Sequence, residues 1–374
     1  MKVDKNGTGS RSFRALLLSQ SLGALNDNIF KLLAQLMVVN ELLKGEAGHG
    51  TLVLINICFV SPYLFVSSLA GWCADKFSKR SVLLISKIAE LLILFFGGIG
   101  LMHHNVPLLL ISLFLLGAQA AFYSPSKYGS IPELLAPEWI SRGNGLIEMF
   151  TFLAIIGGTT VGGLVSAVEI TEWFPLIVMM SLSLVGILST YMIPKVDHQS
   201  TARPPDWNPL NIFPTLKEIK KDRELFLSLC AIGFFWGVGG LQQLNLLLYA
   251  KVLLGLGDLG SSLFLMTLGL GIGIGSALAG VVSAGKIELG LVPIGAFGMA
   301  VGGIVLTFSH NSIVLSSVAL AIMGLSGGFF IVPLNSFFQQ QSPIEQRGSY
   351  IAASNFVAFS GVIVASALLY ICSD

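Results

Sequence analysis

The sequence predicts an all-α polytopic membrane protein, and three observations support that fold class. Hydrophobic residues make up 54% of the 374 residues and charged residues 11%, with a mean hydropathy of +0.81. This composition excludes an ordinary soluble domain. Apolar runs of about 20 residues, enough to cross a bilayer core as a helix, recur along the chain. The runs lack the alternation of polar and apolar residues typical of an outer-membrane barrel, so we expect helices.

Eleven spans can be placed in order along the chain. Residues 1–195 form a predicted six-helix half, with spans at 13–43, 51–73, 81–102, 106–125, 143–168 and 173–193. Residues 225–374 hold five more, at 225–250, 259–284, 289–308, 311–338 and 346–371. The polar segment 196–224 is predicted to be a cytoplasmic linker whose second part forms an amphipathic surface helix. Because a twelfth span is missing, we favour a fragment over a natural protein that stops early.

The placement of charge predicts the orientation in the membrane. Lys and Arg residues in short loops are retained on the cytoplasmic side. If the N-terminus is cytoplasmic, that side holds 17 of the 21 Lys and Arg residues, and the opposite side holds only Lys44 and Lys251. The remaining two, Lys31 and Lys87, fall inside spans. We therefore expect a cytoplasmic N-terminus.

Two neighbouring segments, Tyr123–Leu134 and Arg142–Glu148, place two prolines and several charges at the edges of spans four and five, where broken helix geometry and charge usually have a purpose. A weaker copy around Pro333 and Arg347 predicts that the chain consists of two pseudo-symmetric halves. We expect a cytoplasmic gate at the first copy. Its predicted residues are Tyr123, Lys127, Glu133, Arg142 and Glu148. Glu148 is expected to pair with Lys127, or alternatively to accept a substrate amine or a proton.

The loop between spans two and three carries a second motif. Gly71-Trp72-Cys73-Ala74-Asp75-Lys76-Phe77-Ser78-Lys79-Arg80 resembles the signature of the major facilitator superfamily, with Lys76 in place of the commoner Arg. The resemblance implies two related helical halves with a substrate cavity between them. Asp75 is expected to face a neighbouring helix N-terminus or Arg142. The predicted conformational latch consists of Gly71, Asp75, Lys76, Lys79 and Arg80; a generic basic loop is the alternative.

Polar residues inside the spans are candidates for the substrate cavity. Asp27 is costly at that depth unless it is paired or faces water, and Lys31 lies one helical turn away. These two residues and Asn26 either line the cavity or form an internal ion pair that orients the helix. In the second half, Gln242 and Gln243 would give a polar, neutral wall. Lys87 and Glu90 share a face of the third span, where they could pair; a structural or interfacial role is favoured, and substrate contact is the alternative.

The sequence holds no catalytic constellation. The four cysteines and five histidines show no metal-ligand spacing, and the glycine run Gly269 to Gly275 lies inside a span rather than after a strand, which argues against a nucleotide site. We therefore expect no enzyme activity within the chain, no metal, no cofactor and no nucleic-acid partner.

Several of these segments together resemble the bacterial lysophospholipid transporter family. They are Asn26-Asp27-Asn28, Tyr123-Ser124-Pro125-Ser126-Lys127-Tyr128-Gly129, Pro132-Glu133-Leu134 and Asn144-Gly145-Leu146-Ile147-Glu148, all within residues 13–165. The resemblance implies a monomeric flippase that moves lysophosphatidylethanolamine-like lipids inward across the inner membrane. It also implies functional roles for Asp27 and Lys127 and a supporting role for Glu148. Stand-alone members tend to have an arginine where this chain has Gln242-Gln243, so phosphate recognition would fall to Lys31 or Lys127.

Two alternatives remain open at this stage. The first is a facilitator-fold symporter or exporter of a small amphipathic solute or drug, with Asp27 as its protonation site. The second is the membrane module of a bifunctional protein, with a 2-acylglycerophosphoethanolamine acyltransferase and an acyl-carrier-protein synthetase fused or associated beyond Asp374. The 25 phenylalanines favour the lipid transporter over a sugar carrier, because they provide apolar walls for an acyl chain.

Overall fold

The computed structural model describes residues 7–42, 55, 57–167, 173–196, 208–309 and 311–372, and these residues form helices joined by short loops. The first part of the chain holds α1 (Arg11–Leu42), α3 (Pro62–Lys76), α4 (Lys79–Met102), α5 (Val106–Leu134), α6 (Ile140–Ala167) and α7 (Phe174–Tyr191). After the short α8 (Ile212–Ile219) come α9 (Arg223–Leu248), α10 (Asp258–Val282), α11 (Leu291–Phe308), α12 (Ile313–Gln341) and α13 (Arg347–Cys372). The all-helical membrane fold is thus confirmed.

Ten helices within the described residues are long and apolar enough to cross a membrane, and they match the second to eleventh predicted spans. Helix α1 has 32 residues, which is ample length, but it is less apolar than the others and is not among the ten. The count of eleven spans is therefore not confirmed in detail. The start of the second predicted span and most of the proline-rich part of the linker lie outside the described residues.

Local sequence explains where several helices begin. Polar side chains just before the first turn accept hydrogen bonds from backbone N–H groups that have no partner within the helix. Asn105 accepts from the amide of Leu108 at 3.1 Å at the start of α5. Asp222 accepts from the amides of Glu224 and Leu225 at 2.9 and 3.1 Å at the start of α9. Ser78 and Ser312 cap α4 and α12 in the same way.

The prolines of the Tyr123–Leu134 segment do not end a helix, so the predicted end of the fourth span at residue 125 is wrong. Helix α5 continues through Pro125 and Pro132 to Leu134. Each proline removes one backbone donor, and in a membrane helix neighbouring helices and Ser side chains compensate for this loss. Between the two prolines, the hydroxyl of Ser130 adds a side-chain hydrogen bond to the carbonyl of Ser126 at 2.7 Å. Pro333 likewise lies inside α12, about the same distance from the start of its helix.

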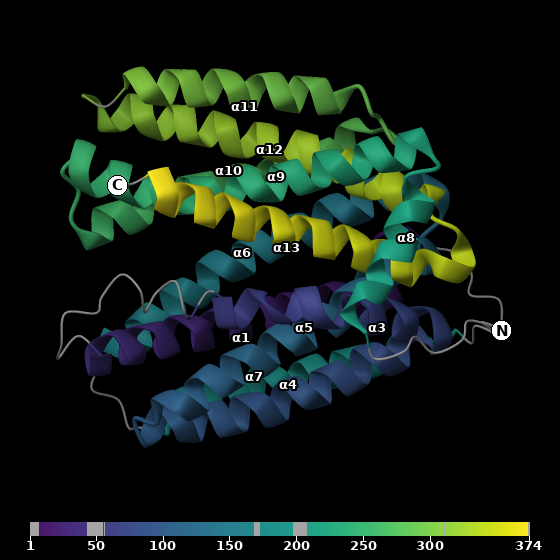
Figure 1. Cartoon of the computed structure of the whole chain (residues 1–374), viewed down its shortest axis with the longest axis horizontal. Coiled ribbons are helices and arrows are strands. Elements are labelled where there is room, and N and C mark those ends of the chain that lie inside the picture. Colours follow the sequence, from purple (N-terminus) through teal and green to yellow (C-terminus); the bar gives the residue numbers. More distant parts are fainter. Residues whose placement is uncertain are drawn as a thin grey trace.

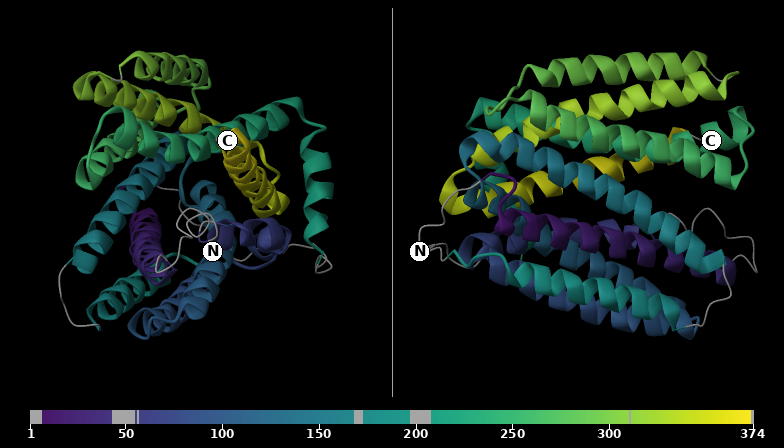
Figure 2. Two further views of the ribbon diagram at one scale, coloured as in Figure 1. Left: turned by 60° about the vertical axis from the view of Figure 1, so that its left-hand side comes forward. Right: turned by 180° about the vertical axis from the view of Figure 1, so that it is seen from behind.

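The helices form two groups with separate apolar cores. In the N-terminal group (α1 to α7), Phe30, Leu94 and Met179 are buried in one such core. In the C-terminal group (α9 to α13), Phe330 and Ile331 are buried in another. Figure 1 shows the C-terminal group above and the N-terminal group below, with α6 passing alongside α10. Views from two further directions show the same arrangement (Figure 2).

Both groups converge at one end of the bundle, which we call the basic end. It is the end at which α1, α4, α6, α9, α11 and α13 begin and α3, α5, α7, α10 and α12 finish. There α8 packs on α13 while the turn before it, Pro209–Asn211, packs on α3, so the described part of the linker contacts both groups. Ile212 and Ile219 of α8 are buried, and its Lys217 is exposed, which agrees with the predicted amphipathic surface helix.

Candidate functional site

Helices α3 and α13 are joined at the basic end by the carboxylate of Asp75. Its Oδ1 accepts from the amide of Gly348 at 2.6 Å, and its Oδ2 accepts from the amide and hydroxyl of Ser349 at 2.9 and 2.6 Å. A carboxylate at the first turn of a helix is favourable, because the amides there lack partners and the helix dipole is positive at that end. Asp75 was expected to face either a helix N-terminus or Arg142, and it faces the N-terminus of α13. The backbones approach so closely that a Cβ at Gly71 would lie 2.7 Å from the Cα of Ser349.

The three basic residues of the latch motif, Lys76, Lys79 and Arg80, have different surroundings. Lys79 Nζ lies 2.5 Å from Glu133 Oε1, and both side chains are largely buried. Glu133 also attracts the guanidinium of Arg347, whose Nε is buried without a hydrogen-bond partner. Arg80 stacks on the ring of Tyr191, 4.4 Å from its centroid, and Lys76 is half-buried at the end of α3. Lys79 of the predicted latch and Glu133 of the predicted gate therefore belong to one charged cluster.

Helix α6 carries a second connection between the groups. Asn144 is fully buried and forms a reciprocal amide pair with Gln339 of α12, with N–O distances of 3.0 and 2.8 Å. Its Nδ2 also donates to Ser336 at 3.2 Å. One turn earlier, Ser141 donates to Ser283 of α10 at 2.8 Å. These side chains tie α6 to two helices of the C-terminal group.

Further into the bundle, Glu148 also joins the two groups. Its Oε1 accepts from the hydroxyl of Tyr128 at 2.7 Å and from Nδ2 of Asn335 on α12 at 3.3 Å. The expected ion pair between Glu148 and Lys127 is not formed. Lys127 Nζ instead lies over the ring of Tyr128, 4.2 Å from its centroid, and interacts with Glu148 only at longer range. The tyrosine hydroxyl, rather than the ammonium, is the hydrogen-bond donor that α5 supplies to this carboxylate.

Asp27 and Lys127 lie within electrostatic range of each other, on α1 and α5. The Oδ1 atom of Asp27 is buried without a hydrogen-bond partner. The internal ion pair between Asp27 and Lys31, one of the two alternatives for these residues, is not formed. Lys31 Nζ lies 5.2 Å from the ring centroid of Phe59, whereas the electrostatic neighbours of Asp27 are Glu90, Lys87 and Lys127. One helical turn separates Asp27 from Lys31 in sequence, but the long lysine stem directs its ammonium to the aromatic ring.

The predicted pairing of Lys87 with Glu90 is confirmed. Lys87 Nζ lies 2.6 Å from Glu90 Oε2, and both side chains are at most 2% exposed. Ser183 of α7 links this pair to Asn26, because its hydroxyl donates to Glu90 at 3.4 Å and accepts from Asn26 at 2.9 Å. Asn26 thus points into the N-terminal group. Tyr123 also lies inside that group, hydrogen-bonded to Ser19 at 3.2 Å and close to Lys87.

The remaining predicted site residues are more isolated. Arg142 is exposed at the start of α6 and lies 5.4 Å from the ring centroid of Trp139. Gln242 is half-buried on α9, and the side chain of Gln243 lies outside the described residues. Within the described part of the chain, no cluster of His, Cys, Asp or Glu could hold a metal ion. In the exposed loop between α10 and α11, Lys286 lies 2.8 Å from Glu288 and lowers the pKa of that carboxyl.

Comparison of the sequence with known families and proteins shows the family of this chain. Residues 16–366 match the model of the Major Facilitator Superfamily. The chain belongs to the major facilitator superfamily. This facilitator is similar to the lysophospholipid transporter LplT of Yersinia pestis (strain Pestoides F) and to LplT of Yersinia pseudotuberculosis serotype O:3 (strain YPIII). Each is 28% identical to it over 96% of this chain and 85% of the relative. It is therefore an LplT-like member of a family of transporters.

Solved structures confirm the facilitator fold. A superfamily transporter, FucP, in the outward conformation aligns with a TM-score of 0.75 at 15% identity, over 97% of this chain and 92% of FucP. A bacterial homologue of the iron transporter ferroportin, in an outward-facing state, aligns with a TM-score of 0.72 at 15% identity, over 98% and 93%.

Sequence reasoning placed Asn335 and Gln339 at the cytoplasmic mouth but did not predict the partners of Glu148 and Asn144. Tyr128 and Asn335 hold Glu148, and Gln339 pairs with Asn144. Asn335 and Gln339 lie near Pro333, in the weaker copy of the Tyr123–Leu134 segment, so the repeat was a signal that could have indicated these partners. The side chains on α12 that face α6 could not be identified without the packing of the two groups.

Proposed function

We propose that this facilitator is a lysophospholipid flippase of the bacterial inner membrane that moves lysophosphatidylethanolamine-like lipids to the cytoplasmic side. The observation that carries the proposal is the set of charges inside the bundle, the half-buried Asp27 and Lys127 and the buried Glu148, which contacts the C-terminal group, in a chain similar to LplT. Buried charge in a membrane protein is costly and typically marks a substrate path.

The chemistry of these residues matches a zwitterionic head group. Lys127 has no ion pair within 4 Å among the described residues, so its ammonium is available to a lipid phosphate. The unpartnered Oδ1 of Asp27 is available to the ammonium of an ethanolamine. Glu148 is already held by two hydrogen bonds, and its role is to connect the head-group site to α12. The single acyl chain would remain against apolar helix surfaces.

Alternating access would follow from relative movement of two bodies, residues 1–195 and 225–374, as in other transporters built from repeats. The connections at Asp75, Asn144 and Ser141 all lie toward the basic end. With the N-terminus in the cytoplasm, these connections would form the closed cytoplasmic gate, and they would break when the substrate is released inward. We propose that a monomer suffices, and that an acyltransferase, fused or associated, re-acylates the delivered lipid.

Transport of labelled lysophosphatidylethanolamine into reconstituted vesicles tests the proposal. Asp27→Asn and Lys127→Ala should each lower the initial rate by about tenfold or more, since losing 1.4 kcal/mol of binding costs a factor of ten. Lys286→Gln, in an exposed loop, is the matched charge-removing control and should transport normally. Failure of the wild-type protein to move the lipid, or normal rates in both site variants with unchanged melting temperatures, would contradict the proposal.

One observation favours a second candidate, a symporter in which Asp27 carries a proton. A buried carboxyl oxygen without a hydrogen-bond partner suits a group that exchanges its proton during the cycle. The same vesicles distinguish the two candidates. If transport of an amphipathic solute requires a proton gradient, and the lysolipid does not move, the symporter is supported and the flippase is not.

A further inference from the structure

A pocket on the outside of the N-terminal group lies apart from the candidate substrate site. It is formed between the start of α1 and the end of α7, at the basic end of the bundle, and has a volume of about 230 Å³. Its lining residues are Arg11, Arg14, Ala15, Leu18, Ser189 and Met192. At about 30 Å³ per water molecule, the volume corresponds to roughly eight waters. That is enough space for a phosphate with part of its glycerol.

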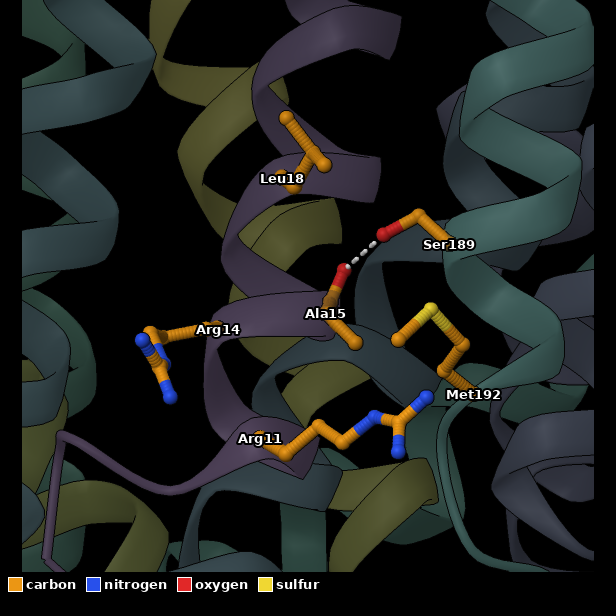
Figure 3. Close-up of a pocket in the computed structure, with 6 residues that line it drawn as sticks. All are labelled: Arg11, Arg14, Ala15, Leu18, Ser189 and Met192. Carbon is orange, nitrogen blue, oxygen red and sulfur yellow. Dashed lines mark hydrogen bonds between the residues drawn. The ribbon is translucent and has the colours of Figure 1, made fainter.

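The walls of the pocket are held in place by hydrogen bonds between the two helices. Ser189 donates to the carbonyl of Ala15 at 2.8 Å, as drawn in Figure 3. One turn further along α1, the hydroxyls of Ser19 and Thr190 are 2.6 Å apart. All four residues are buried. The part of the pocket between Ala15 and Ser189 therefore has a fixed floor, and Met192 completes the wall directly after the end of α7.

The charge of the pocket is positive and its base is apolar. Figure 3 shows Arg11 extending from α1 toward Met192, while the side chain of Arg14 extends from α1 in the opposite direction. Arg14 still lines the pocket, and its guanidinium must turn toward the opening to reach the same phosphate as Arg11. Both arginines are exposed. Leu18 and Met192 are 48% and 46% exposed, so apolar surface continues from the pocket along the helices.

We propose that this pocket binds an anionic membrane phospholipid, with the phosphate held by Arg11 and Arg14 and an acyl chain lying over Leu18 and Met192. The pocket is located where a membrane helix starts and another ends, which is the level of the lipid head groups. Basic residues at that level attract anionic lipids, and guanidinium groups bind phosphate through paired hydrogen bonds. The apolar surface beside the charges distinguishes a lipid from a free phosphate ion.

Lipid titration of the purified protein in detergent, followed by native mass spectrometry, tests the site. Phosphatidylglycerol should bind more tightly than phosphatidylcholine. Arg11→Gln and Arg14→Gln should each weaken phosphatidylglycerol binding by about fivefold, the factor expected for one basic residue at a membrane surface. Arg223→Gln removes an exposed arginine from the same end of the C-terminal group and is the matched control, which should bind normally.

Three results would overturn the proposal. In the first, the two site variants, with melting temperatures unchanged in the absence of lipid, bind phosphatidylglycerol as the wild type does. In the second, Arg223→Gln weakens binding as much as Arg11→Gln, which would indicate general attraction to the basic end. In the third, soluble glycerol phosphate displaces the lipid at equal concentration, which would indicate a site for a free anion.

Discussion

The ion pair between Lys87 and Glu90 shows how a charged residue is accommodated inside the N-terminal group. Both side chains are removed from solvent, and the pair is extended by Ser183 to Asn26 on α1. Breaking a buried pair leaves one charge without compensation, which costs far more than the pair itself contributes. These residues therefore stabilise the arrangement of α1, α4 and α7 beside Asp27.

At this scale we predict that Lys87→Met lowers the free energy of unfolding by about 3–5 kcal/mol, because Glu90 would remain buried and unpaired. The double variant Lys87→Met/Glu90→Met should recover part of this loss. Thermal unfolding in detergent measures both effects. The exposed pair Lys286–Glu288 is the control, since Lys286→Ala should change stability very little. Equal melting temperatures for the wild type and Lys87→Met would refute the structural role.

At the scale of helices, α6 of the N-terminal group and α10 of the C-terminal group pack side by side, and their backbones approach closely. We call this contact the seam. A Cβ at Gly280 would lie 2.8 Å from the Cα of Arg142, and a Cβ at Gly145 would collide with the carbonyl oxygen of Ser276. At Gly273, by contrast, the nearest atom to a Cβ is the carbonyl oxygen of Met149 at 3.6 Å, an ordinary contact. The seam is therefore tight near the basic end and looser further along.

This difference predicts opposite outcomes for the same substitution. Gly145→Ala should lower the free energy of unfolding by about 1–3 kcal/mol, because the helices must move apart. Gly273→Ala should be neutral or stabilising by up to about 1 kcal/mol, because alanine favours the helix. Thermal unfolding of the two variants provides the comparison. A loss of stability at Gly273 as large as that at Gly145 would contradict the described packing.

The sequence predicted the helices well and their side-chain partners poorly. Apolar runs predicted ten helices that match candidate spans, because hydrophobic length is a local property. Partner choice depends on how helices pack. The expected Glu148–Lys127 pair was therefore wrong, and the Asp27–Lys31 pair, one of two alternatives, is not formed. Lys87 and Glu90 were predicted correctly because they are three residues apart on one helix. The contacts of Asn144 and Asp75 with the other group required the structure.

For the molecule as a whole, the connections between the groups at the basic end can be tested by cross-linking. In a variant without its native cysteines, Ser141→Cys/Ser283→Cys should form a disulfide across the groups, because the hydroxyl oxygens are 2.8 Å apart. If alternating access requires this end to open, oxidation should stop lysolipid transport and reduction should restore it.

The matched control is Ser19→Cys/Thr190→Cys, whose hydroxyl oxygens are 2.6 Å apart within the N-terminal group. That disulfide should form without stopping transport, since α1 and α7 belong to one body. Full transport by the oxidised Ser141→Cys/Ser283→Cys protein, with the cross-link verified by mass spectrometry, would show that the basic end need not open at this position.

Asp75 binds mainly to backbone amides of α13 rather than to a particular side chain. Two of its three hydrogen bonds come from the amides of Gly348 and Ser349, and only one comes from a hydroxyl. Substitution of Ser349 would therefore leave most of this connection in place. Gly348 cannot be substituted in the same way, since a Cβ at that position would lie 2.7 Å from the carboxylate oxygen Oδ1 of Asp75. Mutational tolerance should thus differ sharply between two adjacent residues of the same helical turn.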